Sequence, residues 1–191
     1  MKRYIKYLIY TDAEHKWYVR EYLIPHMVKQ GILKRTIEIW TGSFIDRCKW
    51  IAETQEPEES IWHLEWDIVI GDHFKEITDR EYPGFVAGCC DKSDGGKVNC
   101  IGNTSVKGLW MPTECVLIPN AVAIAYADHD GAFKDFILEY NIPARNLMPN
   151  IVENIGQMID KSMIQRSAYW RSDDLNEAVE ELRTWLMNRE E

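Results

Sequence analysis

Two carboxylates separated by one residue stand inside a largely apolar stretch of this chain. They are Glu65 and Asp67, and with Trp66 between them they form what we call the acidic corner. A carboxylate buried in a strand is costly unless it has a partner, and its oxygens are hard ligands that suit Mg²⁺ or Mn²⁺. The pattern predicts a metal and diphosphate site, or else two surface acids on a strand edge.

Polar residues also follow two earlier apolar segments. Thr11 and Asp12 come after residues 4–10, and Thr41-Gly42-Ser43 comes after residues 36–40. Ligands of open α/β sheets collect beyond the carboxyl ends of the strands. We therefore expect Asp12 to share one cleft with both carboxylates of the acidic corner.

The first half of the sequence alternates strand and helix patterns. A helix is predicted from Glu14 to Gln30, with Gly31 as its C-terminal cap and a kink at Pro25. A second helix is predicted over residues 44–55, and a third strand over 60–70, interrupted by the acidic corner. This alternation predicts an α/β fold with a mostly parallel central sheet flanked by helices.

The second half changes character, because its apolar segments are short and are separated by glycine-rich or polar turns. Strands are predicted within residues 84–90, 98–101 and 115–118. A helix is predicted over residues 120–140 with a break at 129–131, and another over 173–188 with Ser172 as its N-cap.

Composition narrows the class of protein. The chain has 191 residues, 46% hydrophobic and 28% charged, which predicts one globular domain. It contains no apolar run of about 20 residues and no signal-peptide pattern, so we expect no membrane span and a cytoplasmic location. The net charge of -9 disfavours broad binding to nucleic-acid phosphates. Five cysteines without Cys-x-x-Cys spacing are interpreted as buried thiols.

The order of these segments resembles the GT-A class of nucleotide-sugar-dependent glycosyltransferases, in particular small phage and bacterial members. The resemblance rests on seven segments: Tyr10 to Ala13, Trp17 to Ile32, Arg47, His63 to Asp67, Cys115 to Asn120, Asp128 to Asp130, and Pro149 to Gly156. It implies a single GT-A-like, Rossmann-like domain over residues 1–191. Residues 1–90 would form the nucleotide-sugar half and residues 91–191 the acceptor half.

The resemblance also implies roles for individual residues. The nucleotide-sugar site would contain Thr11, Asp12, Arg47, Glu65, Trp66 and Asp67. Asp67 would be the main contact of Mg²⁺ or Mn²⁺, assisted by Glu65, while Arg47 would approach the base or the diphosphate. A surface ion pair is the alternative for Arg47. The sequence departs from the family at Asn154, where many members have a histidine that completes the metal shell.

A second acidic pair, Asp128 and Asp130, stands where inverting family members carry their general base. Such a carboxylate would take the proton of the acceptor hydroxyl. Helix capping is the alternative role. We prefer Asp130, because the apolar residues Phe133 and Phe136 follow it, and it would begin a buried helix facing the site.

The predicted function is a hexosyltransferase-type reaction that moves a sugar from a nucleotide diphosphate sugar to a hydroxyl acceptor. The acceptor would be a hydroxymethyl-pyrimidine in phage DNA or a surface glycan, and a phage-encoded enzyme would act in the host cytoplasm. One alternative is a noncatalytic module that binds nucleotide sugars. A nucleotidyltransferase, which would release pyrophosphate, is the other.

Overall fold

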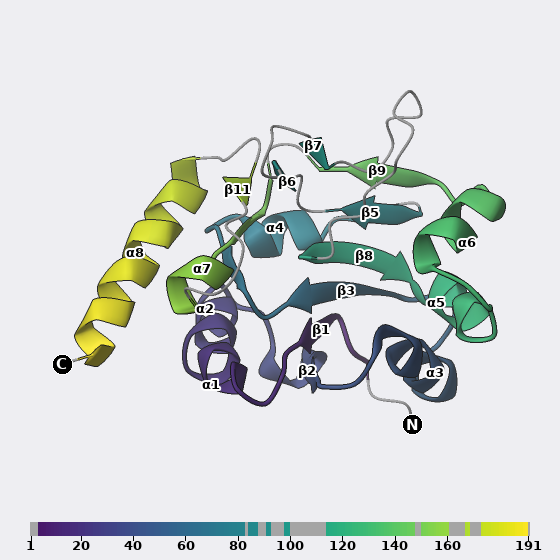
Figure 1. Ribbon diagram of the computed structural model, residues 1–191, viewed down its shortest axis with the longest axis horizontal. Coiled ribbons are helices and arrows are strands. Elements are labelled where there is room, and N and C mark those ends of the chain that lie inside the picture. Colours follow the sequence, from purple (N-terminus) through teal and green to yellow (C-terminus); the bar gives the residue numbers. More distant parts are fainter. Residues whose placement is uncertain are drawn as a thin grey trace.

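The computed structural model of this protein describes residues 4–82, 84–87, 91–92, 98–99, 114–147, 150–160, 167–168 and 173–190. Six strands form its central sheet (Figure 1). They are β1 (Tyr7–Tyr10), β2 (Ile37–Trp40), β3 (Ser60–Glu65), β5 (Phe85–Ala87), β8 (Cys115–Pro119) and β9 (Ala144–Asn146).

The sheet has the order β2-β1-β3-β8-β5-β9 and is mixed. Strands β2, β1 and β3 are parallel, as predicted for the first half. The sheet is mostly parallel, as expected, with one exception: β8 runs antiparallel to both of its neighbours, β3 and β5, so β5 and β9 run in the same direction as the first three strands. A parallel neighbour needs a crossover connection, usually a helix, and the sequence shows no long helix pattern between β5 and β8.

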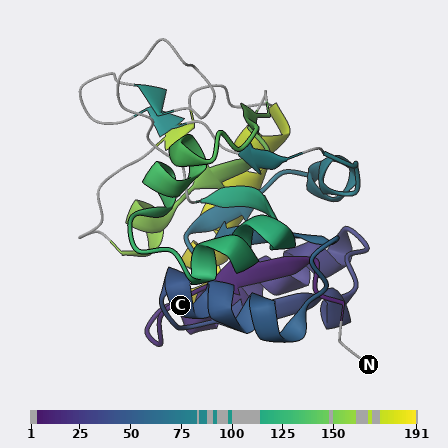
Figure 2. The same ribbon diagram turned by 90° about the vertical axis from the view of Figure 1, so that its right-hand side faces the viewer.

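Helices cover both faces of this sheet, which confirms the α/β class. One face carries α3 (Phe44–Thr54), α5 (Asn120–Ala127) and α6 (Phe133–Glu139), which pack on buried sheet residues such as Leu8 and Ile61. Figure 2 looks onto this side, where α3 and α5 lie next to each other. The apolar side chains of these helices form one of two core clusters.

The other face carries the first helical segment, α4 (Phe74–Thr78), α7 (Gly156–Ile159) and α8 (Asp173–Glu190). In Figure 1 these elements lie on the opposite side of the sheet from α3 and α5. Their apolar side chains pack on Tyr7, Ile9, Trp62 and Leu64 of the central strands. None of the helices in the described ranges is long and apolar enough to cross a membrane.

The first helical segment contains α1 (Lys16–Tyr18), a π-helical turn (Val19–Leu23) and α2 (Ile24–Lys29). Where a kink at Pro25 was predicted, the helix has this π-helical turn, which ends two residues before the proline. Proline cannot donate a helical hydrogen bond, and its ring clashes with the carbonyl four residues before it. The wider π-helical turn gives that carbonyl more room. Gly31 ends the segment at a φ of 84°, as predicted for its cap.

The predicted third strand is in fact two strands in two different sheets. The chain bends at Trp66 and Asp67, and β4 (Ile68–Ile70) leaves the central sheet to pair antiparallel with β10 (Val152–Asn154). In this pair Asn154 lies opposite Ile68. The bend therefore brings the acidic corner next to a segment more than 80 residues further along the chain.

The remaining described elements are small. Strands β6 (Asp91–Lys92), β7 (Val98–Asn99) and β11 (Ser167–Ala168) form a separate antiparallel sheet, and a 3-10 turn covers Lys34–Thr36. Ser43 caps α3, as its hydroxyl accepts a hydrogen bond from the backbone N–H of Asp46. Cys48 and Cys115 are buried free thiols, whereas the predicted cap Ser172 lies outside the described residues.

Candidate functional site

The carboxyl ends of β1 and β3 lie side by side. In their parallel register Tyr10 is the partner of Glu65, so Asp12 and Asp67 follow at the same edge of the sheet. The two carboxylates of the acidic corner have different surroundings, however. Glu65 is half-buried and its charge acts on Arg47, on the α3 face. Asp67 turns toward β10.

Asp67 is held by the segment that begins with Asn154. Its side chain is largely buried, at 8% exposure. The Oδ2 atom of Asp67 accepts a hydrogen bond of 2.8 Å from Nδ2 of Asn154. The backbone carbonyl of Asp67 accepts another, also of 2.8 Å, from the N–H of Ile155. The Oδ1 atom of Asn154 in turn accepts from the N–H of Gly156. The amide therefore fixes the position of a carboxylate that would be costly to bury alone.

Asp12 is exposed, and its carboxylate is bonded to His15. Oδ1 accepts the backbone N–H of His15 at 2.7 Å, and both oxygens lie 2.8 to 2.9 Å from the ring atom Nδ1. The ring of His15 stacks on Trp66 with centroids 3.8 Å apart and planes 4° apart. Asp12 is thus joined to the acidic corner through His15.

Thr11 is fully buried, with 0% exposure. Its N–H donates to the carbonyl of Trp40 and extends the pairing between β1 and β2, while its hydroxyl donates to the carbonyl of Asp12. These bonds make Thr11 a support of the loop that carries Asp12. The role in nucleoside binding that the resemblance implies for Thr11 receives no support from this placement.

Arg47 is buried, with 5% exposure, which overturns the surface ion pair as an account of this residue. Its guanidinium lies 5.0 Å from the ring centroid of Tyr10 and 5.3 Å from that of Phe44. Nη1 donates to Nδ1 of His63 at 3.2 Å. Burial lowers the pKa of Arg47, and the charge of Glu65 acts in the opposite direction. The aromatic rings and His63 hold the cation beneath the sheet edge.

The hydrogen bond from Arg47 requires that Nδ1 of His63 carries no proton. His63 is a buried residue, with 1% exposure. Burial, and then the charge of Arg47, hold the pKa of His63 well below 6.5. Below about pH 6.5 the imidazole of His63 binds a proton in the unfolded chain but not in the folded chain. The contribution of His63 to the free energy of unfolding is therefore fully present above that pH and is lost as the pH falls.

We expect a stability difference between wild type and His63→Gln that is constant above pH 6.5 and shrinks below it, by up to about 1.4 kcal/mol per pH unit. The glutamine amide keeps an acceptor for Arg47 but cannot titrate. Urea unfolding from pH 5 to pH 8 measures the difference. A difference that does not vary with pH would contradict the buried neutral state of His63.

Asp128 and Asp130 are exposed and belong to the side of the sheet that carries α3. Asp128 follows the last residue of α5, and the helix predicted to begin at Asp130 begins instead at Phe133. The reason is Gly131, whose φ of 149° interrupts the helix and whose carbonyl accepts from the hydroxyl of Tyr126. The acidic corner, in contrast, packs through Trp66 into the core cluster on the other face of the sheet. The structure therefore does not bring Asp128 and Asp130 together with the acidic corner in one core cluster.

The acidic corner can be tested against a divalent cation by its donor set. In the described part of the chain, no group of three or more His, Cys, Asp or Glu side chains is arranged to hold a metal ion. Mg²⁺, however, is usually held by one or two carboxylates together with substrate phosphates. Glu65 and Asp67 supply two carboxylates at one sheet edge, so their chemistry fits an ion that is shared with a diphosphate.

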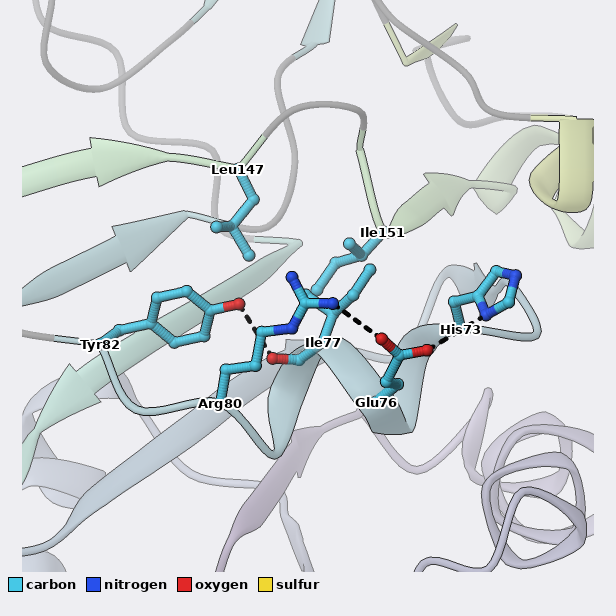
Figure 3. Close-up of a pocket in the computed structure, with 7 residues that line it drawn as sticks. All are labelled: His73, Glu76, Ile77, Arg80, Tyr82, Leu147 and Ile151. Atoms are coloured by element: carbon cyan, nitrogen blue, oxygen red, sulfur yellow. Dashed lines mark hydrogen bonds and ion pairs between the residues drawn. The ribbon is translucent and has the colours of Figure 1, made fainter.

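A cavity of about 380 Å³ lies elsewhere, beside α4 (Figure 3). Its charged residues are paired with each other, since Glu76 bonds to Arg80 at 2.8 Å and lies 3.5 Å from His73. Ile151, on its wall, adjoins the end of β10 that is remote from Asn154. The cavity contains none of the site residues predicted from the sequence.

Comparison with known proteins adds no relative: no protein-family model matches this chain, and no curated protein matches it. The fold and the site themselves define the class: this is an α/β protein with a mixed sheet and an acidic corner at the carboxyl edge of its parallel strands. His15 also belongs to this corner, although it was not predicted from the sequence. The spacing Asp12-x-x-His15 was the signal, because an aspartate bonds readily to groups three residues on at a helix start.

Proposed function

We propose that this protein is a nucleotide-sugar-dependent glycosyltransferase of the GT-A type, with the acidic corner as its diphosphate site. The observation that carries the proposal is the contact between Asp67 and Asn154, 2.8 Å long across 87 residues of sequence. The resemblance to GT-A enzymes requires these two segments to meet at the end of the third central strand. The composition and the periodicity of the sequence alone do not predict a contact between Asp67 and Asn154.

In the proposed reaction the acidic corner receives the diphosphate of the donor. Asp67, assisted by Glu65, would hold Mg²⁺ or Mn²⁺, and such an ion neutralises the charge that develops on a diphosphate leaving group. Asn154 would contribute no ligand, because its Nδ2 donates to Asp67 and its Oδ1 already accepts from the N–H of Gly156. Its contribution is to keep the carboxylate in one orientation before the donor binds, which avoids an ordering cost at the moment of reaction.

The acceptor is a hydroxyl group, and the charge of the chain favours a glycan over DNA. With a net charge of -9 the protein repels a phosphate backbone unless a local surface is basic. The cation whose charge interacts with Glu65, Arg47, is buried beneath aromatic rings. A hydroxymethyl-pyrimidine in DNA is therefore the less favoured acceptor.

Donor binding can be tested by thermal unfolding in the presence of UDP-glucose, UDP-N-acetylglucosamine, GDP-mannose and the free nucleotides, with Mg²⁺, with Mn²⁺ and with a chelator. A donor at 100 times its Kd is expected to stabilise the fold by about 2.7 kcal/mol. The shift should shrink in the chelator. If no nucleotide or nucleotide sugar shifts the midpoint in any of these conditions, the proposal is wrong.

A noncatalytic module that binds nucleotide sugars is the second candidate. One observation favours it: Oδ2 of Asp67 accepts a hydrogen bond from Asn154, at the position where many GT-A enzymes have a histidine that binds the metal. Such a module would give the same thermal shift but would never release a nucleoside diphosphate. Turnover therefore separates the two candidates.

A further inference from the structure

His15 occupies an unusual position for a residue at the start of a helix. Two side chains fix it: the carboxylate of Asp12 accepts its backbone N–H and faces its Nδ1 with both oxygens, and the ring of Trp66 stacks on its ring. A local turn, in which an aspartate side chain bonds to the backbone a few residues on, explains the bond to the backbone. It does not require the second contact to Nδ1 or the stacking on a residue of the acidic corner.

These contacts determine which ring nitrogen of His15 carries the proton. Partial burial raises the pKa of the Asp12 carboxyl group, but the hydrogen bonds from His15 together lower it by more, so Asp12 is ionised at neutral pH. An ionised carboxylate only accepts hydrogen bonds, so Nδ1 must be the protonated nitrogen. The neutral ring then carries its lone pair on Nε2.

Nε2 is also the polar atom of the ring that solvent reaches. The side chain of His15 keeps 11% of its surface exposed. In the described part of the chain Nε2 has no hydrogen-bond partner, and it is not among the polar atoms sealed in the interior. A lone pair oriented by a carboxylate and open to a ligand is the arrangement of a general base.

We propose that His15 is the catalytic base of the transfer reaction and that Asp12 is its positioning residue. The assignment rests on the proposed glycosyltransferase function. As the acceptor oxygen forms its bond to the anomeric carbon of the sugar, its proton passes to Nε2 of His15. The bond between that carbon and the diphosphate oxygen breaks, and the nucleoside diphosphate leaves with the electron pair. The ionised Asp12 stabilises the resulting imidazolium.

The proton position can be tested without any substrate. Nitrogen NMR of the full chain at pH 7.5 should show a protonated Nδ1 and an unprotonated Nε2 on His15. Diethylpyrocarbonate, which acylates unprotonated imidazole nitrogens, should modify His15 at Nε2, as mapped by mass spectrometry. A proton found on Nε2 would overturn the proposal.

The role in turnover is tested with His15→Phe, which keeps a flat ring for Trp66 and removes both nitrogens. We expect kcat to fall by ~10² to 10⁴ with little change in KM, as for loss of a general base. The matched control is His26→Phe, because His26 also stacks on an aromatic ring, that of Tyr22. Imidazole should restore part of the rate in His15→Ala, which a purely structural role would not produce.

The outcomes separate this assignment from the proposed function. Wild-type release of nucleoside diphosphate from UDP-glucose, UDP-N-acetylglucosamine or GDP-mannose, together with an unchanged kcat in His15→Phe, would overturn only the role of His15. A wild-type protein that turns over none of these donors with a range of hydroxyl acceptors would overturn both. Loss of kcat in Asp130→Asn with full activity in His15→Phe would assign the base to Asp130 instead.

Discussion

Replacing Asp67 by asparagine is expected to lower turnover of a nucleotide sugar by ~10²-fold or more while the chain stays folded. The amide keeps the volume of the side chain and an oxygen that can accept from Asn154, but it loses the charge that an ion or a diphosphate site requires. Steady-state release of nucleoside diphosphate measures the first effect. Thermal unfolding measures the second, which should stay within about 1 kcal/mol.

Asp67→Ala is the matched comparison, because it removes the acceptor as well as the charge. The buried Nδ2 group of Asn154 then loses its partner, and we expect a loss of about 1 to 3 kcal/mol of stability. The account is contradicted if Asp67→Asn unfolds as readily as Asp67→Ala yet retains wild-type specific activity. Asp67 would then be a structural acceptor alone.

Replacing Asn154 by aspartate is expected to destabilise the free protein strongly and to make its stability depend on divalent cations. The change puts a second carboxylate within hydrogen-bond distance of Asp67, and like charges at this separation raise the pKa of one of them. The fold should lose about 1 to 3 kcal/mol at pH 7.5 and recover as the pH falls toward 5, because the folded pair then binds a proton. Mg²⁺ or Mn²⁺ should restore stability at pH 7.5.

Asn120→Asp is the control for this experiment. Asn120 is buried like Asn154, at 0% exposure against 8%, and its Nδ2 donates to the carbonyl of Glu56 in a different part of the fold. A new charge there should destabilise the chain without any response to metal. If Mg²⁺ and Mn²⁺ leave the midpoint of Asn154→Asp unchanged as well, the acidic corner does not hold a divalent cation.

Local sequence patterns predicted the first half of the fold well. The strands before Asp12 and before Ser43, the helix capped by Gly31 and the helix begun by Ser43 all have strong signals: β-branched and aromatic runs, a glycine at positive φ and an N-cap serine. These features depend on residues a few positions apart. They can therefore be recognised without knowledge of the tertiary structure.

Tertiary contacts explain what the sequence could not show. The antiparallel direction of β8 and the departure of β4 from the central sheet depend on which distant strands pair. The same limit applies to the site: a helix arginine such as Arg47 gives no sign that Tyr10, Phe44 and His63 will enclose it. The stacking of His15 on Trp66 could not be foreseen either, because the two residues are 51 positions apart in the sequence.

Product analysis tests the central claim most directly. The wild-type chain and Asp67→Asn would be incubated with UDP-glucose, UDP-N-acetylglucosamine or GDP-mannose, with Mg²⁺ or Mn²⁺, and with glycan and hydroxymethylated DNA acceptors, and the products identified by mass spectrometry. A glycosyltransferase predicts a free nucleoside diphosphate and an acceptor heavier by one sugar, both lost in Asp67→Asn. Release of pyrophosphate, or binding of donors without any product, would contradict the account.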